Sequence, residues 1–375
     1  MHAQLAADFE RFGRALPRAW AEHVREAYRI DLASEYLGHP IPHPIGKASG
    51  QLSLKAEQLE ADAAAGLAFV VLKTVIGETP DGHRTMGAWA IHETKMRLER
   101  RSFEGREGWT VTWKGRGWDG TLDEYLSLVA FGRDLAGAGG PLTVPSVKLH
   151  LPHLDEPFAS AEYDHTIAAL AEAWRDGPLL VEKDFSPTLA GDALADEEAR
   201  ILRWIDEVPA RIRAAAPAGA RVALKLMNAR FGEAFQLKML ERALRSADAV
   251  TGFNRLWDQE RARAYGGWEL SDRNLRVLRT AVPARPLSGT GNIGSGALIA
   301  EYAGAGCSSV QLHTLFQLPL TAYPAAAGSR TARTIHKLVF DPEDGLIAAL
   351  LAAEQRGEVS RVGGELRFRD LVRCH

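Results

Sequence analysis

Short runs of β-forming residues recur along the chain, and longer segments with helical spacing of apolar residues separate them. Each run has the length and composition of a buried strand, and each intervening segment has the period of an amphipathic helix. Strands are expected at 44–48, 68–74, 142–149, 179–185, 221–227, 249–253, 285–288 and 309–313. Helices are expected at 53–65, 162–174, 196–215, 235–246, 271–280 and 296–302.

Eight strands that alternate with helices predict a parallel α/β fold, and a closed (β/α)8 barrel fits this count better than an open sheet. Barrels of this kind often exceed 250 residues as one domain, so residues 31–330 are assigned to it. Residues 1–30 form a helical extension. Residues 76–125 form an insertion after the second strand, with four of the nine tryptophans. The tail, 331–375, holds a helix near 346–355 and a hairpin that turns at Gly363 and Gly364.

Composition and charge narrow the function classes. The net charge is −3, from 45 basic and 48 acidic residues, so no bulk field attracts nucleic acid or an anionic membrane. The two cysteines, Cys307 and Cys374, form no metal-binding or disulfide framework, which is typical of a reducing cytoplasm. There is no secretory signal pattern and no apolar stretch near 18 residues. We expect a cytoplasmic protein without integral membrane contact.

Residues 1–30 either pack on the barrel or form an oligomer contact, such as a homodimer.

A glycine-rich turn follows the seventh predicted strand, in the sequence SGTGNIGSG that begins at Ser288. Glycine lets the backbone approach an anion closely and adopt positive φ. The eighth strand ends nearby at His313 and Thr314. Because turns after strands seven and eight often hold phosphate in such barrels, we expect a phosphate here, although such turns also occur with nothing bound.

Two lysines lie within apolar strands, Lys73 on the second and Lys225 on the fifth. A buried lysine is costly unless it meets a partner, so a shared electron-rich ligand is one explanation. The alternative is that each lysine extends to solvent or pairs with a carboxylate. The histidines show no spacing that would gather three or four ligands, so no metal site is expected.

The strand-end motifs, taken in order from about residue 31 to 316, resemble the dihydroorotate dehydrogenase family of FMN-dependent (β/α)8 enzymes. Each motif is weak alone, and six in sequence are fairly specific. They are ASG at 48–50, LKT at 72–74, KL at 225–226, the asparagine at 254, SGTGNI at 288–293 and the small-residue turn that closes the eighth strand.

The resemblance implies an FMN site with small residues along the flavin ring. It implies that Lys225 holds the ring edge where negative charge gathers on reduction. The family also places a base before a proline in the strand-four loop, which is Ser186 here, and that base removes a proton while hydride leaves the adjacent carbon for flavin N5. The implied cofactor contacts are Ala48, Ser49, Gly50, Lys73, Thr74, Lys225, Asn254, Gly289, Gly291, Asn292, His313 and Thr314.

Departures from the family concern the substrate. The family's strand-four loop carries two asparagines, whereas this chain has Lys183 and Thr188 at those positions, and no asparagine occurs from 77 to 147. Losing these amides would leave groups of orotate unpaired, at ~1–3 kcal/mol each. We therefore expect a small substrate other than orotate, with Lys183 available for a carboxylate. Serine is a weak base, so Ser186 needs a water chain or a partner such as Asp184; its alternative role is to cap a turn.

Three other functions stay open at this point. A flavin-free aldolase or isomerase could use Lys225 or Lys73 as a Schiff base. A non-catalytic member could bind a flavin or a partner protein. Reduction of uracil in RNA, as in the related dihydrouridine synthases, is disfavoured by the acidic balance and the lack of a basic stripe.

Overall fold

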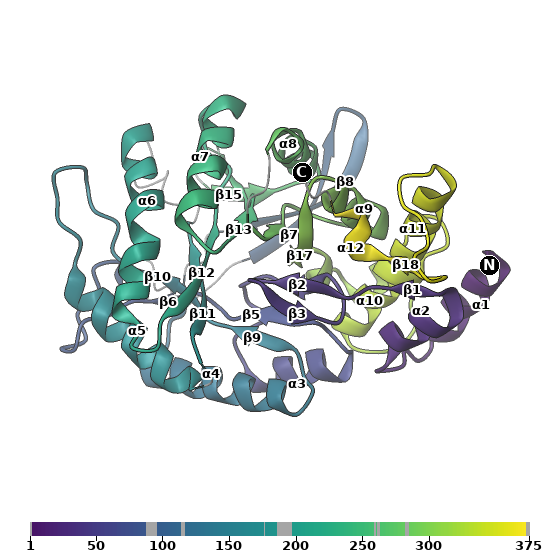
Figure 1. The fold of residues 1–375 in the computed structure, drawn as a ribbon, viewed down its shortest axis with the longest axis horizontal. Helices are drawn as coiled ribbons and strands as arrows, with labels where there is room; N and C mark the ends of the chain where they lie inside the picture. The colour runs from purple at the N-terminus through teal and green to yellow at the C-terminus, as the bar shows by residue number, and fades with distance from the viewer. Residues whose placement is uncertain are drawn as a thin grey trace.

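A curled, ten-stranded parallel sheet forms the centre of the molecule in the computed structural model (Figure 1). The structure describes residues 2–87, 96–113, 117–175, 177–185, 197–258, 260, 263–281 and 285–372. The strands are β4 (Ile45–Lys47), β5 (Phe69–Val71), β6 (Val75–Ile76), β9 (Leu142–Val144), β10 (Ser146–Lys148), β11 (Leu179–Asp184), β12 (Ala220–Lys225), β13 (Ala249–Gly252), β16 (Leu287–Gly289) and β17 (Cys307–Leu312). Each of the eight predicted strands coincides with part of this sheet, which confirms a parallel α/β fold with a barrel-like curl.

The order of the strands is β6-β10-β11-β12-β13-β16-β17-β4-β5-β9, and every neighbouring pair is parallel. Two chain segments, 69–76 and 142–148, each contribute two strands to this order. β5 pairs with β9 and β6 pairs with β10, so the two segments lie side by side along both of their strands. Between the halves, the Leu72 amide donates to the Val144 carbonyl at 2.9 Å.

Within the part of the chain that the structure describes, eight helices cover the sheet, one after each strand segment. They are α3 (Ala56–Ala64), α4 (Leu122–Gly137), α5 (Ser160–Trp174), α6 (Glu198–Ala215), α7 (Glu233–Ser246), α8 (Glu269–Thr280), α9 (Gly296–Gly304) and α10 (Arg330–Phe340). Consecutive helices contact one another, and α10 contacts both α9 and α3. Side-chain caps fix several of the starts: Thr121 forms a capping box with Glu124, and Ser295 and Ser329 cap α9 and α10.

The N-terminal and C-terminal segments lie together on one side of the sheet (Figure 1). The N-terminal residues form α1 (His2–Phe12), α2 (Trp20–Tyr28) and β1 (Ile30–Asp31), and the tail forms α11 (Leu346–Gln355), β18 (Leu366–Arg367) and α12 (Phe368–Leu371). α1 contacts α10, and β18 pairs in parallel with β1. The turn predicted at Gly363 and Gly364 is present, but only one antiparallel bridge, from Val362 to Glu365, flanks it. The expected hairpin is therefore limited to this one bridge, and the residues that follow it pair with the N-terminal β1.

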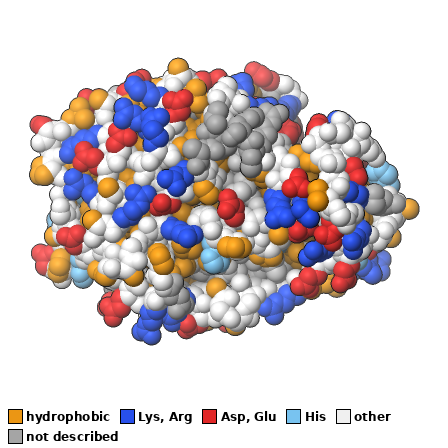
Figure 2. Space-filling model, viewed as in Figure 1, with side chains coloured by type: hydrophobic (Ala, Val, Ile, Leu, Met, Phe, Trp, Pro, Cys, Tyr) orange, Lys and Arg blue, Asp and Glu red, His pale blue; other side chains and the backbone are white. Residues whose placement is uncertain are grey.

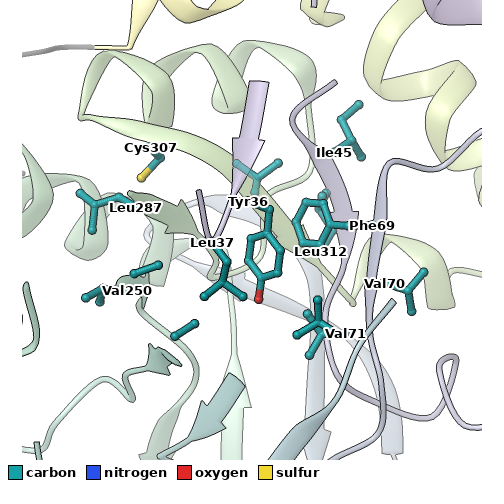
Figure 3. Close-up of a cluster of buried hydrophobic side chains, with 14 of the residues drawn as sticks. Tyr36, Leu37, Ile45, Phe69, Val70, Val71, Val250, Leu287, Cys307 and Leu312 are labelled. Carbon is teal, nitrogen blue, oxygen red and sulfur yellow. The ribbon is translucent and has the colours of Figure 1, made fainter. Parts of the chain in front are cut away.

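A short hairpin plugs the end of the sheet where its strands begin. It consists of β2 (Ser34–Tyr36) and β3 (His39–Ile41), and β2 contacts β17. The Tyr36 ring stacks on Phe69 with ring centroids 4.1 Å apart, inside the apolar cluster drawn in Figure 3. The hairpin closes the interior at this end and carries the Tyr36 hydroxyl inward.

The insertion contributes to a separate antiparallel sheet at the other end. Its order is β14-β15-β8-β7, built from β7 (Met96–Phe103), β8 (Arg106–Trp113), β14 (Leu256–Asp258) and β15 (Arg263–Gly266). The insertion thus pairs with a segment more than a hundred residues later in the chain. Trp89 lies outside the described residues, whereas Trp109 and Trp118 pack against the main core.

Among the described helices, none combines the length and apolarity needed to cross a membrane. On the face shown in Figure 2, acidic and basic side chains are intermixed and do not gather into a single basic area.

Candidate functional site

A small cavity of about 50 Å³ lies at the carboxyl ends of the parallel strands, beneath the antiparallel sheet. Val111 and Gly266 of that sheet line it from above. Residues that follow β4, β13, β16 and β17 form the rest of its wall, together with Lys225 of β12 and Gln311 of β17. Many of the residues predicted to bind a cofactor are among them. They are Ala48, Ser49, Lys225, Asn254, Gly291, Asn292, His313 and Thr314.

The other predicted cofactor contacts lie directly around this cavity. The Thr74 hydroxyl is 2.8 Å from that of Ser49, so the first two strand ends are joined by a hydrogen bond. Gly50 lies against the His313 imidazole, and a Cβ there would collide with the ring. Gly289 lies in the same way against the Tyr302 ring. Gly50 therefore allows close packing of the cavity wall, whereas Gly289 allows close packing of β16 against α9.

A buried polar network forms the floor of the cavity. Lys225 Nζ donates to Gln311 Oε1 at 3.1 Å and lies 3.5 Å from Glu182 Oε1. The other oxygen of Glu182 accepts from Gln311 Nε2 at 2.5 Å and from the Tyr36 hydroxyl at 3.1 Å. Glu182 is fully buried and Lys225 is 3% exposed. Since a buried charge needs a charged or hydrogen-bonding partner, this network holds the Lys225 ammonium in place.

Charged side chains from other strand ends surround the same space. Lys148 on β10 forms an ion pair with Asp184 on β11 at 2.8 Å. Burial alone would raise the pKa of Asp184, but the Lys148 and Lys225 ammonium groups hold it below its usual value. Arg255, which follows Asn254, also lines the cavity, and burial lowers its pKa to about 10. Asp184 is therefore a carboxylate and Arg255 a cation at neutral pH.

Burial and nearby positive charges lower the pKa values of both Lys73 and His313. Burial, followed by the charges of Arg255 and Lys148, lowers the pKa of Lys73 to about 7. Burial and the nearby Arg255 and Lys73 also lower the pKa of His313 well below its usual value. The imidazole is therefore neutral at physiological pH, and its Nε2 lies 2.5 Å from Gln317 Nε2.

The structure does not bring Lys183 together with these residues. Side chains alternate between the two faces of a strand, and Glu182 and Asp184 both face the interior. Lys183 consequently faces the helices, where Glu162 of α5 is a charged neighbour, and its Nζ has no hydrogen-bond partner among the described residues. Asp184, rather than Lys183, faces the interior of the curled sheet from this strand, where it pairs with Lys148. Ser186 and Thr188 lie outside the described residues.

The glycine-rich turn is held by side chains from two directions. Gly291 has φ of +117° and Asn292 has φ of 63°. The Asn274 amide of α8 donates to the carbonyl of Thr290 at 2.7 Å, and Asn292 Nδ2 donates to the Trp109 carbonyl of β8 at 3.0 Å. The antiparallel sheet therefore contacts the turn directly.

A second cavity, of about 450 Å³, opens on the other side of this turn. Gly294 and Ser295 at the start of α9 line it, together with Lys337 of α10. Asn292 and Thr314 line both cavities. The Leu298 amide at this helix start donates to the Ser295 hydroxyl at 3.1 Å, and the Ala297 amide donates to the Asp344 carbonyl at 2.8 Å, so both amides are already paired.

Replacing Gly291 with alanine is expected to lower the free energy of unfolding by ~1–3 kcal/mol, the usual cost of a strained backbone conformation. The new Cβ would also collide with the Asn274 amide that holds the turn. The matched control is Gly294→Ala, because a Cβ at Gly294 meets nothing closer than the Asn292 carbonyl oxygen at 4.0 Å. Chemical denaturation measures both variants, and equal losses of stability would contradict this description of the turn.

Sequence reasoning missed four residues of the site: Tyr36, Lys148, Arg255 and Gln311. Lys148 and Gln311 sit on predicted strands, so a check of strand alternation could have assigned each to the interior. Arg255 directly follows the predicted Asn254. Tyr36 gave no signal, because the hairpin that carries it was not predicted.

Comparisons with known proteins add no relative. No protein-family model matches the sequence, and a search of curated proteins finds no significant match. Among the described residues, no group of three or more potential ligands could hold a metal ion.

Proposed function

We propose that this protein is an FMN-dependent oxidoreductase similar to the dihydroorotate dehydrogenases, interconverting CH–CH and C=C next to a carbonyl in a small molecule other than orotate. One observation carries the proposal. Residues chosen from separate motifs, spread from Ala48 to Thr314, line a single cavity at the carboxyl ends of the strands. Ligand sites in parallel α/β folds occur at this edge.

We also propose that the curled sheet is a (β/α)8 barrel. β9 and β10 are separated by Pro145 alone, and β5 and β6 by residues 72–74. If β5 with β6 is one interrupted strand and β9 with β10 is another, the sheet has eight strands. The first and last strands in its order are then the same two neighbours, so the sheet closes on itself. The contacts of α10 with both α9 and α3 support the same closure, because they complete a ring of helices.

The side chains around the cavity fit FMN in their chemistry. Lys225 supplies a fixed cation for the ring edge that gains charge on reduction, and the turn at Gly291 and Asn292 supplies backbone amides for a phosphate. The cavity of about 50 Å³ is smaller than the ~300–1,000 Å³ of ordinary ligand pockets. Binding therefore requires the wall to widen.

When bound, FMN would accept hydride from a substrate carbon, a reaction that protein side chains do not perform alone. The chain itself would position the reactants and move the proton. Lys225, held by Glu182 and Gln311, would orient the ring edge. Ser186 stays the proposed base. Asp184, two residues earlier, is kept ionised by its cationic neighbours and is available as a hydrogen-bond acceptor.

Anaerobic reoxidation of photoreduced protein tests the proposed reaction. The purified full-length protein would be photoreduced, and cyclic amides and enoyl acids would be added in turn while the flavin absorbance is followed. Return of the oxidised spectrum with one of these compounds, and not with its saturated analogue, is the expected result. Flavin that no acceptor reoxidises would instead favour a non-catalytic flavin-binding protein.

One observation favours a second candidate, a Schiff-base aldolase or isomerase that uses Lys73. Burial and neighbouring cations lower the pKa of Lys73 from 10.5 to about 7, so a large share of its amine is uncharged and nucleophilic at neutral pH. Under this candidate, borohydride trapping of a carbonyl compound would increase as the pH rises through about 7.

The Lys73→Arg variant would abolish this trapping. Lys183→Arg is the matched control, because burial also lowers the pKa of Lys183 to about 7 while its side chain faces away from the cavity. No adduct at Lys73 in the wild-type protein, over the whole pH range, would exclude this candidate.

A further inference from the structure

Lys225 stands between the cavity and a buried carboxylate. Lys225 and Gln311 line the cavity, whereas Glu182 is fully buried behind them, with its Oε1 3.5 Å from Lys225 Nζ. On the neighbouring parallel strand, Glu182 lies opposite Ala223, two residues before Lys225. The carboxylate therefore lies one layer deeper in the curled sheet than the ammonium, farther from the strand ends that form the cavity.

The surroundings of Glu182 suit a charged carboxylate. The hydroxyls of Tyr36 and Thr251 donate to its Oε2 at 3.1 and 3.5 Å. Gln311 Nε2 donates to the same oxygen at 2.5 Å, while the other oxygen faces the Lys225 ammonium. A carboxylate accepts hydrogen bonds and donates none, so these partners match it. One buried anion thus stands directly behind the cation that the cavity presents.

This buried anion weakens the field that Lys225 applies to a ligand. Charges inside a protein act over several ångströms, because the interior screens them less than water does. Together with burial and other cations, the Lys225 ammonium lowers the pKa of His313, which also lines the cavity. The negative charge of Glu182 opposes that field. A negative charge on a ligand is therefore stabilised less than it would be by the ammonium alone.

From this arrangement we infer that Glu182 is a positioning residue that lowers, through Lys225, the reduction potential of a bound flavin. The inference rests on the proposed function, which supplies the flavin. Hydride uptake brings two electrons and one proton to the flavin and leaves a negative charge at the ring edge. Lys225 stabilises that charge and Glu182 opposes it, so the pair gives a lower potential than the lysine alone. A lower potential favours hydride transfer from the flavin to a C=C acceptor.

Reduction potentials of the FMN-loaded full-length protein test the inference, measured anaerobically against a dye of known potential. Glu182→Gln keeps the size of the side chain and removes its charge, so its potential should rise. The expected rise is at least tenfold in the equilibrium constant for reduction, or about 30 mV for a two-electron couple. Tyr36→Phe is the matched control, because it removes a hydrogen bond to Glu182 and leaves the charge, and it should shift the potential less. An unchanged or lower potential in Glu182→Gln, or an equal rise in Tyr36→Phe, would overturn the inference.

A charge-swapped variant keeps the test decisive if Glu182→Gln fails to fold. In Glu182→Gln with Gln311→Glu, the amide and the carboxylate change places, so the hydrogen bond between these positions and the total charge of the network are both retained. The carboxylate then stands on the cavity wall, directly beside Lys225. The potential of this variant should be lower than that of the wild type. An equal or higher potential would contradict the role of a negative charge beside Lys225.

FMN content, measured by absorbance, separates this inference from the proposed function. A wild-type protein that takes up no FMN contradicts both. Bound FMN whose potential does not change in Glu182→Gln contradicts the inference and leaves the proposed function standing.

Discussion

Replacing Lys225 with methionine is expected to lower the free energy of unfolding by about 3–5 kcal/mol, because it removes one partner of a buried ion pair. Glu182 is fully buried, and without the ammonium it would keep only neutral partners such as Gln311 and Tyr36. Chemical denaturation measures this loss. The variant should also bind FMN at least tenfold more weakly, since Lys225 is the cation proposed for the ring edge.

The double variant Lys225→Met with Glu182→Gln separates these two effects. A glutamine at 182 can still hydrogen-bond to Gln311 and Tyr36 but carries no charge. Most of the lost stability should return, while FMN affinity should stay low. If the double variant is as unstable as the single variant, the loss does not arise from the buried carboxylate. If FMN affinity returns with stability, Lys225 does not contact the flavin.

A second buried ion pair, directly before the predicted flavin contact Ala48, should have an effect of similar size. Lys47 on β4 contacts Asp62 on α3, and the Thr331 hydroxyl of α10 donates to the same carboxylate at 2.6 Å. Burial raises the pKa of Asp62, and the Lys47 ammonium opposes that rise. Lys47→Met should therefore cost about 3–5 kcal/mol of stability, because it leaves this carboxylate without its cation.

Two controls accompany this variant in the same denaturation experiment. Lys47→Met with Asp62→Asn should recover much of the stability, because no uncompensated charge is left in the interior. Arg276→Met removes an exposed ion pair with Glu233 and should cost less than ~1 kcal/mol, as surface pairs do. A loss in Lys47→Met no larger than in Arg276→Met would show that the pair contributes nothing to joining β4, α3 and α10.

The parts of the fold that could be predicted depend on local sequence patterns. The strand at 179–185 and the helix at 235–246 are recognisable because each buries one apolar run or one apolar face. α4 was missed, because the predicted insertion was extended to 125 while the Thr121 cap starts the helix at Leu122. The antiparallel sheet could not be predicted, since β8 pairs with β15 across a long stretch of chain and neither segment identifies its partner.

The residues of the candidate site also fall into those that local sequence patterns predict and those that depend on tertiary contacts. Ser49, Asn254 and Asn292 follow strands directly, so their position at the carboxyl edge is a consequence of strand order. Lys183 was chosen because it occupies the position of an asparagine in the strand-four loop of the family that the chain resembles, but the alternation of side chains along β11 sends Asp184 inward instead. The role of Glu182 depends on Tyr36 and Gln311, which approach it from distant parts of the chain. Such convergence depends on tertiary structure alone.

The central claim is that this protein holds FMN at the carboxyl ends of its parallel strands. The most direct test is an absorption spectrum of the purified protein from 300 to 550 nm, followed by heat release and mass analysis of any chromophore. Bands near ~375 and ~450 nm, with released FMN in a one-to-one ratio to the chain, are the expected result. A colourless protein that also fails to bind added FMN would contradict the claim.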